Sequence, residues 1–121
     1  MARFLVVDDS KLARTQLKSL IEELGHEVIA EAKDGLEGYD MYMSHKPDIV
    51  TLDNIMPNMG GTDCLKKIIT ADPNAKVIMV SSIGKNTTIK EQISIGASNF
   101  VTKPYEKETI SKVFEEVLAK K

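Results

Sequence analysis

The sequence predicts an α/β protein with a doubly wound, five-stranded parallel sheet and helices on both faces. Short apolar runs alternate with segments whose apolar residues recur at helical spacing, which gives five strand–helix units. Runs that are apolar throughout are typical of parallel strands buried on both faces, and strands that follow one another in this way require right-handed crossovers. No internal repeat or low-complexity tract interrupts the pattern. We therefore expect one domain over residues 1–121.

Five runs are predicted as strands because each is too short for a helix and is rich in large or β-branched apolar side chains. In chain order these runs are residues 3–7, 27–31, 48–52, 76–80 and 99–102.

The first two helices are predicted from their end signals. Ser10 is placed to cap the first helix, and Gly25 is placed to end it. Asp34, followed three residues later by Glu37, is typical of a capping box. It opens a second helix that runs to about His45.

The other three helices follow the third, fourth and fifth strands. Leu65 and Ile68 indicate a short helix that closes before Pro73. Residues 85–95 form a helix without a wide apolar stripe, because its isoleucines lie among threonines, and Gly96 caps it. The last helix has a strongly apolar face, made by Ile110, Val113, Phe114, Val117 and Leu118.

Composition excludes several classes of protein. The hydrophobic fraction of 42% and the charged fraction of 28% are typical of a soluble globular domain. A net charge of -2 with interspersed acids and bases argues against nucleic-acid binding. The single cysteine, Cys64, is expected to be buried on a helix; it excludes an intramolecular disulfide and suits a reducing cytosol. No apolar run approaches the ~18 residues of a membrane span. We expect a cytoplasmic monomer.

Charged residues follow three of the predicted strands. Asp8 and Asp9 come after the first strand, Asp53 after the third, and Lys103 after the fifth. Taken separately, each is an ordinary surface residue. In parallel sheets, however, functional groups collect beyond the carboxyl ends of strands. Three unrelated coincidences at these strand ends are harder to accept than one shared site.

From Arg3 to about Leu118 the chain resembles the receiver domain of two-component response regulators. The resemblance is carried by Asp8-Asp9, by Asp53 with Met56-Pro57, by Ser81 and by Lys103-Pro104. It implies a flavodoxin-like sheet with strand order 2-1-3-4-5. The sequence segments at residues 30–35 and 80–84 are similar to those of stand-alone receivers of the chemotaxis type.

The resemblance implies that Asp53 accepts a phosphoryl group from the phosphohistidine of a sensor histidine kinase. It also implies a Mg²⁺ site made by Asp8, Asp9, Asp53 and the backbone carbonyl of Ile55. Mg²⁺ prefers such oxygen ligands. Three carboxylates so close together repel one another, so we expect them to titrate as a coupled set.

Two further residues complete the implied acceptor site. Lys103 is expected to pair first with Asp53 and then with the phosphoryl oxygens, and a cis peptide before Pro104 is expected to orient it. The Ser81 hydroxyl and the amide of residue 82 would bind the same oxygens. Apart from promoting its own phosphorylation and dephosphorylation, the protein is not expected to be an enzyme.

The resemblance also implies how phosphorylation is read out. Ser81 moves toward the phosphoryl group and Phe100 shifts inward, which changes the face made by the last two helices and the fifth strand. An output protein, such as a flagellar motor switch component, would bind this face, and a phosphatase is a further possible partner. The alternative is that Phe100 is an ordinary core residue. Ile55 and Ile83 cannot orient an attacking water, so a long-lived phosphoryl group is expected.

Other functions stay open at this point. The chain could be a phosphorelay intermediate, or a receiver domain from a longer regulator with a DNA-binding or enzymatic output. A flavin-binding electron carrier shares the sheet order, but Asp8 and Asp9 would repel the flavin phosphate. A phosphatase that uses Asp53 would usually carry a second acid at the position of Ile55.

Overall fold

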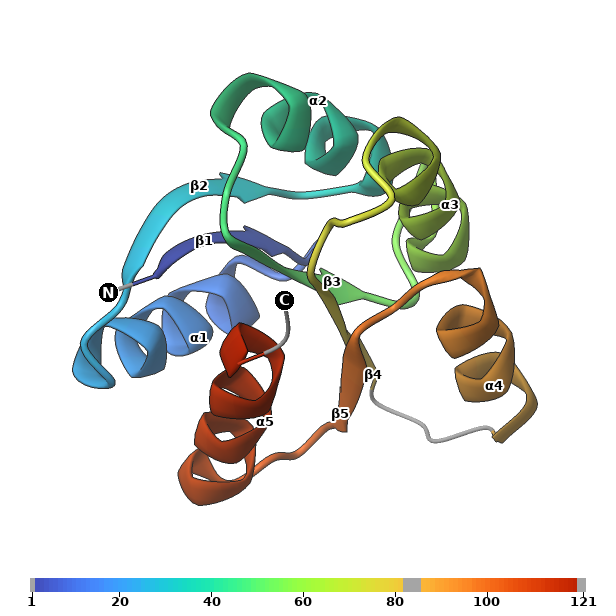
Figure 1. Ribbon diagram of the computed structural model, residues 1–121. Coiled ribbons are helices and arrows are strands. Elements are labelled where there is room, and N and C mark those ends of the chain that lie inside the picture. Colours follow the sequence, from blue (N-terminus) through green and yellow to red (C-terminus); the bar gives the residue numbers. More distant parts are fainter. Residues whose placement is uncertain (1, 82–85, 120–121) are drawn as a thin grey trace.

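The computed structural model, which describes residues 2–81 and 86–119, is built on a five-stranded parallel sheet (Figure 1). The strands are β1 (Arg3–Val7), β2 (Glu27–Ala32), β3 (Ile49–Asp53), β4 (Val77–Ser81) and β5 (Asn99–Thr102). Their order in the sheet is β2-β1-β3-β4-β5, and all neighbouring pairs are parallel. The predicted fold class and strand order are confirmed, and each predicted strand end lies within one residue of the observed one.

Five helices connect the strands and cover both faces of the sheet (Figure 1). They are α1 (Lys11–Glu23), α2 (Gly35–His45), α3 (Gly61–Ala71), α4 (Asn86–Ile95) and α5 (Lys107–Ala119). Helices α1 and α5 lie on one face, and α2, α3 and α4 lie on the other. Among the residues that the structure describes, no helix is both long and apolar enough to cross a membrane.

Alternate residues of each strand point to opposite faces and build two separate cores. In β1, Phe4 packs with α1 and α5, whereas Leu5 packs with α2 and α3. The Phe4 and Phe114 rings meet edge to face with centroids 4.8 Å apart. Cys64 is buried on α3, as expected, and burial raises the pKa of its thiol to about 12. The thiol is therefore protonated and inert at neutral pH.

The end signals read from the sequence hold, with one difference. Ser10 accepts a hydrogen bond from the Ala13 N–H at 3.2 Å, and Asp34 accepts one from the Glu37 N–H at 2.8 Å. The Glu37 carboxylate accepts from the Lys33 N–H, one residue before the cap, and not from Asp34 itself. The capping box is thus displaced by one residue, but it still begins α2 as predicted.

Candidate functional site

Three carboxylates lie together at the carboxyl edge of the sheet. β1 and β3 are neighbours, so Asp8 and Asp9, which follow β1, come close to Asp53 at the end of β3. One oxygen from each side chain lies within 4.8 Å of the other two. Asp8 and Asp53 are buried, whereas Asp9 is exposed. Such a group of hard oxygen donors fits a Mg²⁺ ion, because the carboxylates repel one another unless a cation lies between them.

Lys103 supplies the positive charge at this edge. Its ammonium donates a hydrogen bond to Asp8 Oδ2 at 2.8 Å and lies 3.6 Å from Asp53 Oδ1. The expected ion pair with Asp53 is therefore present, but the hydrogen bond goes to Asp8. The reason is that the Ser10 N–H holds the other Asp8 oxygen at 2.9 Å, which orients Oδ2 toward Lys103. The peptide before Pro104 is cis, as expected.

The environment changes the acidity of two of these groups. Burial raises the pKa of Asp53, and the nearby charge of Asp8 raises it further, against the opposing effects of Lys103 and of a hydrogen bond from the backbone of Asn54. Burial lowers the pKa of Lys103, but its hydrogen bond to Asp8 and the charge of Asp53 outweigh this and raise that pKa overall. Lys103 thus stays charged at neutral pH, while the ionised form of Asp53 is disfavoured.

The other residues predicted for the site were expected on β4, on β5 and in the segments that follow β3 and β4. Ser81 is buried at the end of β4, and its carbonyl accepts a hydrogen bond from the Lys103 N–H at 2.6 Å. Phe100, on the edge strand β5, is 38% exposed, so the alternative that it is an ordinary core residue is wrong. Ile55 is 72% exposed beside the acceptor strand. Ile83 and the amide of residue 82 lie outside the described residues.

Two polar residues near the site were not singled out from the sequence. Arg14 of α1 donates a hydrogen bond to the Asp8 carbonyl at 2.7 Å and forms an ion pair with Glu31. Gln92 of α4 is 2% exposed. Its spacing of three residues from Ile95 could have placed it on the inner face of the helix, but its partners are distant in sequence.

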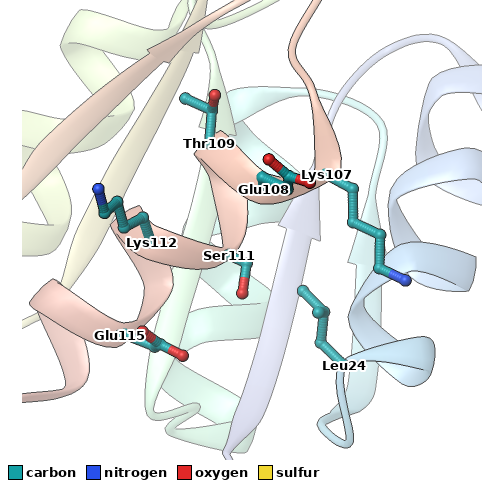
Figure 2. A pocket seen from close by; sticks show the side chains of 7 residues that line it. All are labelled: Leu24, Lys107, Glu108, Thr109, Ser111, Lys112 and Glu115. Atoms are coloured by element: carbon teal, nitrogen blue, oxygen red, sulfur yellow. The ribbon is translucent and has the colours of Figure 1, made fainter.

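A surface hollow of about 600 Å³ lies between α5 and the residue that follows α1 (Figure 2). Its lining residues are Leu24, Lys107, Glu108, Thr109, Ser111, Lys112 and Glu115. None of them belongs to the cluster of carboxylates and lysine. The site is therefore identified by its charges and not by the size of a hollow.

Comparison with known proteins finds matches over nearly the whole chain. The family model of the response regulator receiver domain matches residues 4–115. The chain is 41% identical over 115 residues to the chemotaxis protein CheY of Listeria monocytogenes, covering 95% of this chain and 97% of that protein. It is 41% identical to CheY of Thermotoga maritima, covering 95% and 96%.

A solved structure is similar over almost the whole chain. The CheX-CheY-BeF3-Mg complex from Borrelia burgdorferi contains a chain that superposes with a TM-score of 0.95 at 38% identity, covering 98% of this chain and 90% of that one. The family match, the sequence identities and the shared fold lead to one conclusion: the chain belongs to the response regulator receiver domain family.

Proposed function

We propose that this receiver domain is a phosphorylation-activated switch of the chemotaxis type and that Asp53 is its phosphoacceptor. The observation that supports this most directly is the meeting of Asp8, Asp9 and Asp53 beside the Lys103 ammonium. Chemotaxis proteins among its relatives match nearly the full chain, which supports the pathway. The donor would be the phosphohistidine of a partner kinase. The protein would act in the cytoplasm as a single-domain monomer.

Mg²⁺ would be held by Asp8, Asp9, Asp53 and the backbone carbonyl of Ile55. The Borrelia burgdorferi relative was solved with Mg and BeF3, which supports this choice of metal. The bound ion would supply positive charge that offsets the repulsion between the carboxylates and the incoming phosphoryl group. Burial and the charge of Asp8 raise the pKa of Asp53, which is consistent with a site that needs such a cation.

In the transfer step, an Asp53 carboxylate oxygen forms a bond to phosphorus as the P–N bond of the phosphohistidine breaks. The imidazole leaves with the electron pair and takes up a proton. Lys103 lies 3.6 Å from Asp53, close enough to reach the oxygens of the attached phosphoryl group with a small shift. Together with the Ser81 hydroxyl it would stabilise the charge that develops on these oxygens.

The output would be a change in the face formed by α4, β5 and α5. Phe100 is partly exposed there and adjoins a hollow that Thr102 and Tyr105 also line. Movement of Ser81 toward the phosphoryl group would let Phe100 turn inward and change the surface offered to a partner, such as a motor switch component or a phosphatase. Phosphorylation-dependent partner binding that is unchanged in Phe100→Ala would contradict this part of the proposal.

A long phosphoryl lifetime is a second part of the proposal. Ile55 is exposed beside the acceptor and its side chain has no polar atom to orient an attacking water. In Ile55→Asn, and in Ile83→Glu, the loss of phosphate in Mg²⁺ should slow little or become faster. A marked slowing in either variant would contradict the proposed role of these isoleucines.

The test of the acceptor is incubation with Mg²⁺ and acetyl phosphate, followed by measurement of the intact mass. The wild type should gain one phosphoryl group, and Asp53→Asn should gain none. A mass increase that persists in Asp53→Asn would reject the assignment. Stoichiometric use of acetyl phosphate and the lack of flavin colour would separate the switch from a phosphatase and from a flavin-binding carrier.

A further inference from the structure

Helix α4 is attached to the rest of the protein through a buried polar side chain. Gln92 is 2% exposed. Burial of a carboxamide is strongly unfavourable unless the group gains hydrogen-bond partners in place of water. Among residues 88–95, the part of α4 whose side chains the structure describes, it is the only fully buried one. Ile93 is 45% exposed, and Ile95 is half-buried against the core. Few apolar contacts therefore hold this helix, so the partners of Gln92 matter.

Both partners of Gln92 lie in the segment that follows the acceptor strand. Its Nε2 donates hydrogen bonds to Asn54 Oδ1 at 2.8 Å and to Thr62 Oγ1 at 3.1 Å. A carboxamide nitrogen carries two hydrogens, so its donor capacity is used in full. The polar contact thus joins α4 to the residue that follows β3 and to the first turn of α3.

Asn54 is the residue directly after Asp53, and two hydrogen bonds hold it. Its carbonyl accepts from the Gly61 N–H at 2.8 Å, and its side chain accepts from Gln92. There is little free space at this point, because a Cβ on Gly61 would lie 2.3 Å from the Asp53 carbonyl oxygen. A displacement of the Asn54 side chain is therefore passed to the peptide beside Asp53.

We propose that Gln92 is a positioning residue that couples the placement of α4 to the state of the acceptor through Asn54. This inference rests on the proposed function of Asp53 and adds a contact separate from Ser81 and Phe100. When the acceptor is loaded, the Asn54 peptide adjusts, and the hydrogen bond from Gln92 transmits that adjustment to α4. The reverse also holds, since a partner that holds α4 in one place favours one state of Asp53.

The test uses BeF3 and Mg²⁺ as a stable mimic of the phosphoryl group, with hydrogen exchange of the backbone amides in residues 88–95 as the readout. In the wild type, the exchange rates of these amides should differ between the free and the loaded protein. The ratio of the faster rate to the slower rate measures this response. In Gln92→Met, which keeps the length of the side chain but has no donor, this ratio should fall roughly two- to tenfold, the range that one neutral hydrogen bond covers. Thr62→Val is the matched control, because it removes one bond to Gln92 but keeps the bond to Asn54. It should respond as the wild type does.

Asn54→Ala removes the same bond from its other end and should lower the ratio to the same extent, and the double variant with Gln92→Met should lower it no further. This second variant decides the matter if Gln92→Met does not fold. An unchanged ratio in either single variant, or a lowered ratio in Thr62→Val, would overturn the inference.

Intact mass after incubation with acetyl phosphate separates the two proposals. If the wild type is not modified, the acceptor assignment fails and the inference fails with it. If it is modified but residues 88–95 do not respond, only the inference fails.

Discussion

Replacement of Asp53 by asparagine is expected to stabilise the metal-free fold at neutral pH, although it removes the residue on which the proposed function depends. Asp53 is buried, and its carboxylate lies between one ammonium and two further carboxylates. Asparagine keeps the shape of the side chain but removes the charge. The sign of the change in stability depends on whether the attraction to Lys103 outweighs the repulsion from the other carboxylates together with the cost of burying the charge.

The distances allow the charges to be compared. At an effective dielectric constant of about 20, Lys103 at 3.6 Å attracts Asp53 by about 4.6 kcal/mol. Asp8, at no more than 4.8 Å, repels it by about 3.5 kcal/mol or more, and exposed Asp9 adds a smaller, screened repulsion. These charge interactions nearly cancel, which leaves the loss of hydration. Burial of an ion costs several kcal/mol, and burial of a neutral amide costs less, so we expect a net gain of about 2 kcal/mol.

The assay is urea unfolding of both proteins with a chelator present, repeated over a range of pH. Because the pKa of Asp53 is raised above its ordinary value of 3.8, the folded wild type binds this proton more tightly than the unfolded chain. The advantage of Asp53→Asn should therefore be complete above the raised pKa and should shrink as the pH falls through it toward 3.8. Asp40→Asn, at an exposed position of α2, is the control and should change stability by less than about 0.5 kcal/mol. Equal or lower stability of Asp53→Asn at neutral pH would show that the attraction to Lys103 dominates and would refute this reasoning.

Three other predictions concern stability. Gly61→Ser should destabilise by about 1–3 kcal/mol or more, because its Cβ would meet the Asp53 carbonyl oxygen at 2.3 Å. The same change at Gly60, where the nearest atom is 3.6 Å away and serine can cap α3, should be neutral or slightly stabilising in thermal unfolding. Thr51→Val should stabilise by about 1 kcal/mol in urea, since the buried Thr51 hydroxyl has no hydrogen-bond partner among the residues that the structure describes; a loss of stability would contradict this reasoning. Mg²⁺ at ten times its Kd should raise the stability of the wild type by about 1.4 kcal/mol and that of Asp53→Asn by less; an equal rise would place the ion elsewhere.

Most of the fold is encoded by signals that act over a few residues. The short apolar runs, the caps at Ser10 and Asp34, and the glycines with positive φ at Gly25 and Gly96 are local features, and each appears in the structure near its predicted position. The rule that parallel strands end at one edge then brings Asp8 and Asp53 together without any knowledge of packing. For these features the sequence is sufficient, because the backbone geometry of each element depends on its own residues.

The finer organisation of the site depends on how distant elements pack. Lys103 donates its hydrogen bond to Asp8, 95 positions away, and not to Asp53, because the Ser10 amide orients the Asp8 carboxylate. Phe100 is partly exposed because β5 is an edge strand, which no pattern within its four residues reveals. The spacing of Gln92 from Ile95 could indicate an inward position, but its partner Asn54, 38 positions earlier, is decided only by the packing of α4. Local patterns thus determine the elements and the edge where the charged residues meet. Which donor meets which acceptor is decided only by packing, since a hydrogen bond depends on differences of less than an ångström between elements far apart in the chain.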